Sequence, residues 1–224
     1  MQKAAISYYP SEVEVKAIRE LDGSIPVKAI TAYVYDQFLD NIQDDFARRE
    51  GLLFVGGFAH LPNVDAVLWF ARDVFPHIRQ RLPEIVFYVV GSKATDEIKA
   101  LEQPGNGIVV KGFVSEEELA RLYQTCKVAV VPLRYGAGVK GKVVEAVYNG
   151  IPVVTTSTGA EGIPLAGTVM EIEDQPRDFA DKVVRLYCDN QRCQSMCRRT
   201  QEYIKHNYSM DGAWRIIEED FRQV

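Results

Sequence analysis

Cysteine, histidine and tryptophan are scarce in this sequence, which contains four, three and two of them, respectively. Cys193 and Cys197 stand four residues apart and would share one face of a helix. A zinc site needs two further ligands, and His206 is the only histidine nearby. With Cys126 and Cys188 lying elsewhere in the chain, we expect no bound metal and free thiols, as in a reducing cytoplasm.

The sequence also lacks a long apolar run and an excess of positive charge. No apolar run reaches the roughly 20 residues that span a bilayer. No signal-peptide pattern follows Met1, so we expect a soluble, cytoplasmic protein. The net charge is -5 and the pI is near 5.3, which excludes the basic face of a nucleic-acid binder. A chain of 224 residues can bury a substantial core without disulfides.

Short runs rich in valine and isoleucine alternate with longer helical patterns from residue 52 onward. The runs are nearly continuous in apolar residues, as in strands buried on both faces of a parallel sheet. They cover residues 52–55, 85–90, 108–110, 128–131 and 152–156, and the helical patterns between them include 65–81, 116–125 and 142–149. This alternation predicts a doubly wound sheet with right-handed crossovers, whose ligands bind at the carboxyl ends of the strands.

The two ends of the chain follow other patterns. Ser11 is placed to cap a helix that runs to about Leu21, and residues 25–30 read as one more strand before a polar linker at 36–50. The C-terminal third is helical over residues 176–189, 191–208 and 210–222. Pro176 suits the first turn of its helix, where no N–H is needed.

Glycines follow several of the expected strands. Gly57 would let a ligand approach the backbone closely, although a tight turn explains it equally well. The backbone beside Gly112 could hydrogen-bond the edge of a nucleobase. Ser115 and the glutamates at 116–118 are better explained as a helix cap and first turn than as a metal site.

The richest strand end covers residues 132–146, with three glycines and three cations ahead of a helix. Unpaired N–H groups, a helix N-terminus and positive charge suit a diphosphate. Glu145, one turn into the helix, can accept two hydrogen bonds from vicinal ribose hydroxyls. The alternative is a flexible basic loop with a glutamate that complements the helix dipole. Residues 154–163 offer hydroxyls and glycines that would close the pocket, or only a Ser/Thr turn.

These segments together resemble the C-terminal domain of the family 4, or group 1, retaining glycosyltransferases of GT-B architecture. The likeness extends from about Leu52 to Ile163. It is carried by residues 54–57, 61–66, 89–91, 110–114, 138–146, 150–154 and 159–162, in this order and spacing.

The resemblance implies an α/β fold with a Rossmann-like, doubly wound parallel sheet, the C-terminal half of a two-domain enzyme. Residues 1–50 would be a remnant of the N-terminal acceptor domain and the linker. Residues 51–208 would form the nucleotide-sugar-binding domain, and 209–224 a helix that crosses back to the N-terminal domain. We therefore expect the chain to be a fragment of a longer protein.

By the same likeness, Glu145 is the second glutamate of a Glu-x7-Glu motif and holds the donor ribose. The first glutamate falls on Ala137 and is absent, and Lys142 and Arg134 become the expected diphosphate contacts. The full predicted donor site comprises Gly57, Asn63, Lys111, Gly112, Phe113, Arg134, Gly138, Lys142, Glu145, Thr158 and Gly159. The catalytic residues are expected in the other domain.

The predicted function is hexosyl transfer, with retention, from a nucleoside-diphosphate sugar to a glycan or lipid-linked acceptor in polysaccharide biosynthesis. No cofactor, metal or nucleic acid is expected, and peripheral membrane association of the full-length enzyme is left open. The isolated chain should bind donor weakly and turn over little. The alternatives are a sugar-nucleotide epimerase of GT-B-like fold, a degenerate module that binds nucleotide sugar without catalysis, and a flavodoxin-like domain with no sugar role.

Overall fold

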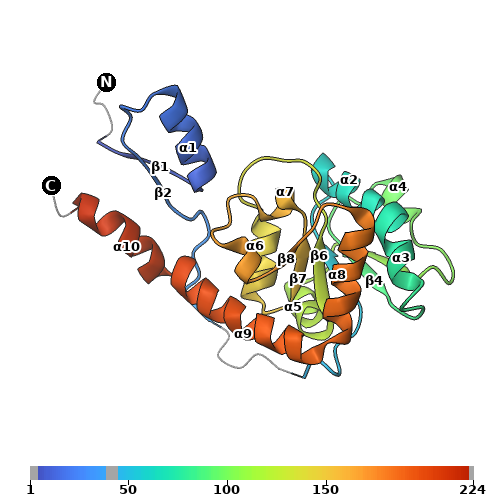
Figure 1. The fold of residues 1–224 in the computed structure, drawn as a ribbon. Helices are drawn as coiled ribbons and strands as arrows, with labels where there is room; N and C mark the ends of the chain where they lie inside the picture. Colours follow the sequence, from blue (N-terminus) through green and yellow to red (C-terminus); the bar gives the residue numbers. More distant parts are fainter. Residues whose placement is uncertain (1–4, 39–44, 222–224) are drawn as a thin grey trace.

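The computed structural model describes residues 5–38 and 45–221, and its main body is a six-stranded parallel sheet flanked by helices (Figure 1). The strand order is β5-β4-β3-β6-β7-β8, and every neighbouring pair is parallel. The strands are β3 (Leu52–Val55), β4 (Phe87–Val90), β5 (Ile108–Gly112), β6 (Val128–Val131), β7 (Val153–Thr155) and β8 (Glu171–Ile172). The predicted fold class is therefore confirmed.

The strand order places a topological switch between β3 and β6. From β3 the chain winds outward through β4 to β5, and from β6 it winds the other way through β7 to β8. Doubly wound sheets bind their ligands in the crevice at such a switch, outside the carboxyl ends of the strands. The candidate site is therefore expected where β3 and β6 end.

Helices cover the sheet because its central strands are apolar on both faces. The helices of this body are α2 (Leu61–Trp69), α3 (Phe75–Arg79), α4 (Asp96–Lys99), α5 (Glu116–Thr125), α6 (Gly141–Tyr148), α7 (Ser157–Ala160), α8 (Pro176–Cys188) and α9 (Asn190–Asn207). Both α6 and α8 pack against β6 and β7, which are buried along their whole length. The core beside α3 is aromatic, with the rings of Phe70 and Phe87 4.7 Å apart.

One predicted helix, residues 65–81, differs in the structure. It begins earlier, at Leu61, because Pro62 fits the first turn of a helix, where its missing N–H costs nothing. It is then interrupted by a π-helical turn at Phe70–Val74 before α3 begins. Pro76 explains the interruption, since a proline inside a helix removes one backbone hydrogen bond and clashes with the preceding turn.

A smaller unit at the N-terminus lies apart from the large sheet. It consists of β1 (Ser7–Tyr9), α1 (Glu12–Leu21) and β2 (Val27–Ala29), with β1 and β2 paired in parallel. The last helix, α10 (Met210–Phe221), continues from α9 away from the main body, as Figure 1 shows, and contacts both α9 and this unit. Asp220 accepts hydrogen bonds from the Tyr8 hydroxyl at 2.7 Å and from Lys28 Nζ at 2.7 Å.

The connection between the two parts is fixed by Tyr35. Its N–H donates to the Tyr208 carbonyl at 2.7 Å, and it forms a parallel β-bridge with Ser209. Its ring stacks on that of Tyr148 in α6, with the centroids 3.9 Å apart and the planes 7° from parallel. The chain passes between the two parts twice, once after β2 and once after α9, and we call these two segments crossings. They are therefore tied to each other and to α6.

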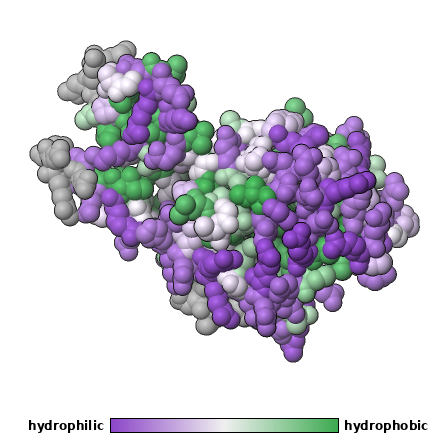
Figure 2. Space-filling view, viewed as in Figure 1, coloured by the Kyte–Doolittle hydropathy of each residue, from purple (hydrophilic) through white to green (hydrophobic). Residues whose placement is uncertain are grey.

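The surface view shows apolar residues on both parts. In Figure 2 hydrophobic residues gather on the N-terminal unit beside hydrophilic ones, and a hydrophobic area also lies on the otherwise largely hydrophilic main body. The exposed apolar side chains of the unit and of α10 are Val13, Leu21, Ile25, Met210, Trp214 and Phe221. Among the helices that the structure describes, none combines the length and apolar character needed to cross a bilayer.

Candidate functional site

The carboxyl ends of β3 and β4 form a backbone ledge without side chains. Gly56 and Gly91 lie so close that a Cβ on Gly91 would fall 2.0 Å from the Gly56 carbonyl oxygen. Beside this ledge, Asn63 of α2 donates from Nδ2 to the Gly57 carbonyl at 2.7 Å. That bond fixes the orientation of the amide, because a flipped amide would place two oxygens together.

Asn63 is only 4% exposed, and its Oδ1 has no hydrogen-bond partner within the described residues. A buried acceptor without a partner is costly, and in native proteins it usually points to a ligand, an ion or a water molecule. The amide therefore marks this ledge as a place where a polar ligand would be stabilised.

The N-terminus of α6 faces the same ledge. Lys140 is its N-cap residue and makes no capping side-chain hydrogen bond. The first N–H groups of a helix have no partner within the helix and carry partial positive charge. Lys142, in the first turn, extends across to β3, since a Cβ on Gly56 would lie 3.1 Å from Lys142 Cε and 2.9 Å from Asn63 Nδ2. The structure thus brings Gly56, Asn63 and Lys142 together from separate elements.

The two charged groups of this helix face are half-buried. Burial lowers the pKa of Lys142 below its ordinary value, and the charge of Lys140 lowers it further. Burial raises the pKa of Glu145, an effect that Lys142 partly offsets. Neither side chain forms an ion pair or a hydrogen bond within the part of the chain that the structure describes. Both are therefore partly desolvated while still able to receive a ligand, a combination typical of binding sites.

Other cations of the strand ends are neutralised by neighbouring carboxylates. Lys111 pairs with Glu118 at 2.7 Å, and Lys140 pairs with Glu161 at 3.0 Å. Lys111 thus ties β5 to α5, and Lys140 fastens the loop before α6 to the end of α7.

Arg134 is directed to α2. Its guanidinium makes a two-point ion pair with Asp65 and lies over the Trp69 ring, 5.8 Å from the centroid. The hydrogen bond to Asp65 raises the pKa of Arg134. Its expected contact with a diphosphate stays a prediction, and the structure places Lys142 much better for that contact.

The remaining predicted residues are distributed along the same edge of the sheet. Gly112 has a positive φ of 66° with open space around it, and Phe113 beside it is 81% exposed. Gly138 also has a positive φ, 77°, and the Glu14 carboxylate of α1 lies 3.7 Å from the position of a Cβ there.

Gly159 and Thr158 have structural partners. A Cβ on Gly159 would lie 2.0 Å from Thr155 Oγ1, so close packing against β7 accounts for this glycine. Its N–H donates to Thr156 Oγ1 at 3.1 Å and begins α7. Thr158 Oγ1 donates to the Arg134 carbonyl at 3.4 Å. Their role toward a ligand stays a prediction.

A pocket of 440 Å³ opens over the outer face of α6. It is lined by Tyr33, Tyr35, Gly141, Lys142, Glu145, Tyr148 and Asn149. The tyrosines at 33 and 35 were not predicted, because they lie within residues 1–50, which were assigned to a remnant of the acceptor domain and the linker. No local motif marks such residues, since only the tertiary path of the chain brings them to α6.

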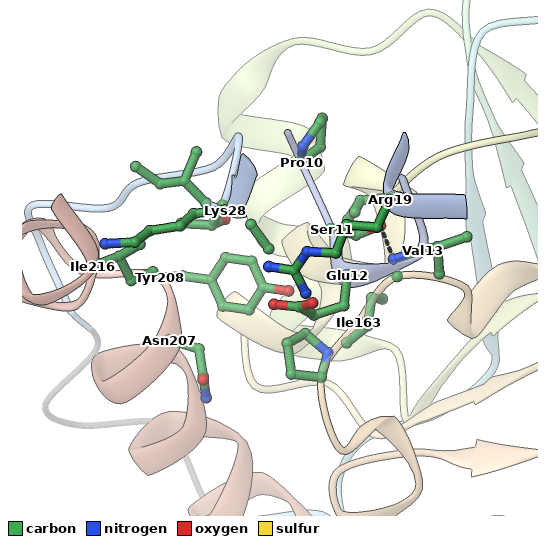
Figure 3. Close-up of a pocket in the computed structure, with 16 residues that line it drawn as sticks. Pro10, Ser11, Glu12, Val13, Arg19, Lys28, Ile163, Asn207, Tyr208 and Ile216 are labelled. Carbon is green, nitrogen blue, oxygen red and sulfur yellow. Dashed lines mark hydrogen bonds between the residues drawn. The ribbon is translucent and has the colours of Figure 1, made fainter. Parts of the chain in front are cut away.

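A larger, more apolar cavity of 650 Å³ lies between the N-terminal unit and the main body (Figure 3). In this view Glu12, Arg19 and Tyr208 point toward one another across it. Its cations have partners: Arg19 donates to the Val27 carbonyl at 3.0 Å, and Lys28 pairs with Asp220. This cavity borders the loop before α6 through Val139 and the turn after α7 through Gly162, and its cations Arg19 and Lys28 are both engaged by neighbouring groups.

Sequence comparison identifies the family. The profile of a family described as "Glycosyl transferases group 1" matches residues 49–189, and the chain belongs to this family. An uncharacterized 44.6 kDa protein in the cps region of Klebsiella pneumoniae is 26% identical over 204 residues, which are 88% of this chain and 50% of that protein. The chain thus spans about half the length of this relative.

Solved structures show the same fold. TarM of S. aureus, solved with UDP among its ligands, has a TM-score of 0.74 at 16% identity, with 96% of this chain and 43% of that chain covered. Sucrose-phosphate synthase of Thermosynechococcus elongatus has a TM-score of 0.73 at 18% identity, with 99% and 58% covered. Anabaena HepE, solved with UDP and glucose, gives 0.72 at 16% identity, with 99% and 64% covered. The fold is the C-terminal domain of a GT-B glycosyltransferase, as the sequence resemblance predicts.

Proposed function

We propose that this chain is the donor-binding domain of a retaining glycosyltransferase that moves a hexosyl group from a nucleoside-diphosphate sugar to a glycan or lipid-linked acceptor. One observation carries the proposal: Lys142 and Glu145 share a face of α6, unpaired within the described residues, beside the open ledge of β3. The family membership and the UDP bound in the TarM and HepE structures support it.

In this proposal Glu145 holds the donor ribose. An ionised carboxylate has two acceptor oxygens and can accept one hydrogen bond from each of two vicinal hydroxyls. An amide has only one acceptor oxygen and binds such a pair less well. The raised pKa of Glu145 reflects a desolvated position, where each accepted hydrogen bond stabilises the ionised form. Ribose binding would therefore relieve an unfavourable burial.

The diphosphate would lie at the N-terminus of α6. There the free N–H groups, the helix dipole and Lys142 all favour negative charge, and Gly57 admits the phosphates close to the backbone. The same groups would stabilise the charge that develops on the leaving diphosphate as the glycosidic bond breaks. The N–H groups among them are held in place by the helix before the bond breaks.

The acceptor and the catalytic residues are proposed to belong to a second domain. Position 137 offers only the methyl group of Ala137, so no carboxylate from that position would face the transferred sugar. Within the described residues there is no cluster of three or more side chains that suits a metal. The proposed enzyme acts in the cytoplasm in polysaccharide biosynthesis, with the full-length protein associated peripherally with the membrane surface.

Isothermal titration of the chain with UDP, GDP and ADP tests the donor site. We expect one of these nucleotides to bind, and Lys142→Met and Glu145→Ala each to weaken binding about 10-fold or more, since each removes a hydrogen bond to a charged group. Arg81→Met is the matched control, because Arg81 pairs with Asp181 on the surface away from the site. A folded chain that binds none of the nucleotides would refute the proposal.

A further inference from the structure

The segment after β2 presents Tyr33 in a fixed conformation. Thr31 Oγ1 donates to the Tyr33 carbonyl at 3.0 Å and accepts from the Tyr33 N–H at 3.1 Å. Two residues later, Tyr35 is held by its backbone bond to Tyr208 and by its stack on Tyr148. The backbone is therefore tied on both sides of Tyr33, and its ring has a defined position.

That position is the N-terminus of α6. A Cβ on Gly141 would lie 2.7 Å from the Tyr33 hydroxyl oxygen and 3.0 Å from its Cζ. Gly141 is the first residue of α6, so the phenol edge lies directly against the helix end. A side chain at position 141 would displace it. Glycine is thus explained here by the need to admit a tyrosine from another part of the chain.

The Tyr33 hydroxyl has no hydrogen-bond partner within the described residues. It lines the same 440 Å³ pocket as Lys142 and Glu145, and that volume lies within the range of small-molecule sites, about 300–1,000 Å³. The pocket therefore joins a phenol O–H to an ammonium group and to the uncapped end of a helix. These three groups are donors suited to an anion, whereas Glu145 in the same pocket is an acceptor suited to the ribose hydroxyls.

We propose that Tyr33 is a donor-binding residue, whose hydroxyl donates a hydrogen bond to the diphosphate of the nucleotide sugar. This rests on the function proposed above and adds a residue from outside the nucleotide-binding domain. A second observation points to a ligand with a hydrogen-bond donor, such as a sugar hydroxyl, beside Lys142: the Oδ1 of Asn63 is a buried acceptor without a partner among the described residues. Tyr35, whose ring is stacked on Tyr148, acts on Tyr33 as a positioning residue.

The consequence is that the diphosphate contacts both parts of the molecule. Tyr33 belongs to the crossing that connects the N-terminal unit to the main body, and Tyr35 bonds that crossing to the other one, at Tyr208 and Ser209. A bound diphosphate would therefore hold the crossing against α6, whereas a bound nucleoside without phosphates would not.

Titration of the chain with UDP and with uridine, for wild type and Tyr33→Phe, tests the proposal. We expect Tyr33→Phe to weaken UDP binding about 10-fold while leaving uridine binding unchanged. Glu145→Gln should weaken both ligands, because the ribose is common to them. Tyr88→Phe is the control, since Tyr88 packs against Gly51 at the other end of β3. Far-UV circular dichroism and thermal melting show whether each variant is folded.

The outcomes separate the two proposals. If wild type binds UDP and Tyr33→Phe binds it equally well, the assignment of Tyr33 is overturned while the donor site stands. An equal loss for uridine and UDP would also overturn it, because the hydroxyl would then not act on the diphosphate. If wild type binds neither UDP, GDP nor ADP, the donor site itself fails. Tyr35→Ala should show part of the loss of UDP affinity seen for Tyr33→Phe. Tyr35→Phe, which keeps the stacked ring, should bind UDP as tightly as wild type.

Discussion

Lys142 and Asn63 meet over Gly56, although they come from α6 and α2 and stand far apart in the sequence. A Cβ on Gly56 would lie 3.1 Å from Lys142 Cε and 2.9 Å from Asn63 Nδ2. Asn63 is held in place by its bond to the Gly57 carbonyl, so the flexible lysine is the side chain that would give way. The glycine is therefore part of what positions the ammonium group.

Gly56→Ala is expected to displace Lys142 and weaken UDP binding about 10-fold, because the charge-assisted contact to the diphosphate is lost or lengthened. The variant should also lose about 1–3 kcal/mol of stability from overpacking. Calorimetric titration and chemical denaturation measure the two effects. Gly167→Ala is the matched control, as nothing lies within 4 Å of a Cβ there. Unchanged UDP affinity in Gly56→Ala would contradict this account of Lys142.

Lys142→Met is expected to stabilise the unliganded chain at pH 7 while impairing nucleotide binding. The pKa of Lys142 is lowered in the folded state, so at pH 7 the folded chain bears the cost of a buried charge that the unfolded chain does not. Wild-type stability should rise as the pH increases from the folded pKa to the unfolded pKa of about 10.4, and the advantage of the variant should shrink there. Thermal melts of both proteins between pH 7 and 10.5 measure this difference in stability. A variant less stable at pH 7 would show that Lys142 packs favourably instead.

The sheet and most of the helices were predictable from the sequence because their signals are local. Valine-rich runs without alternation indicated buried parallel strands, and β3 and β6 appear where these runs lie. The two-residue β8 was missed, since Glu171 and Ile172 carry no pattern of their own and pair only because β7 offers an edge. The π-helical turn at Phe70–Val74 was missed because the apolar period continues through it.

The site was only partly predictable, and the limit is again physical. Sequence order assigned Lys142 and Glu145 to one helix face, and the strand ends to one edge of the sheet. It did not reveal which cations have carboxylate partners, because the Arg134–Asp65 pair joins residues 69 positions apart. Tyr33 was likewise hidden, since its contact with Gly141 depends on the path of the chain between the two parts.

Gly159→Ala tests the packing at the end of β7. A Cβ there would lie 2.0 Å from Thr155 Oγ1, which is fully buried and donates to the Val131 carbonyl at 2.7 Å. Neither the strand nor the hydroxyl can move without loss of that bond, so we expect destabilisation of about 2–3 kcal/mol. Urea denaturation of this variant beside Gly167→Ala provides the measurement. An equal midpoint for the two variants would show that α7 relaxes freely.

Arg134→Met tests whether Arg134 binds the nucleotide, as proposed for Lys142, or only stabilises the structure through Asp65. Because Arg134 is engaged by Asp65, its loss should weaken UDP binding less than the loss of Lys142, by about 3-fold or less, as expected for an exposed ion pair. Asp65→Asn frees the guanidinium and should leave UDP affinity equal or slightly higher. Calorimetric titration of both variants decides the matter. A loss for Arg134→Met as large as that for Lys142→Met would mean that the arginine leaves Asp65 and contacts the nucleotide.

The pH dependence of UDP affinity should report both charged groups of α6. In the proposed site, binding requires Glu145 to be ionised and Lys142 to be protonated. Burial raises the pKa of Glu145, so affinity should begin to fall on acidification above the ordinary glutamate value of about 4.3. Burial lowers the pKa of Lys142, so affinity should also fall on the alkaline side, below about 10.4.

The terminal phosphate of UDP titrates as well, with a pKa near 6, and contributes to the acidic limb. Glu145→Gln isolates the carboxylate, because glutamine does not titrate and only the phosphate limb should remain. Lys142→Met should likewise remove the contribution of the ammonium group to the alkaline limb. Titrations from pH 4.5 to 10 compare the three proteins. Identical profiles in wild type and Glu145→Gln would exclude Glu145 from nucleotide binding, whereas a narrower wild-type profile would place both charges of α6 at the bound nucleotide.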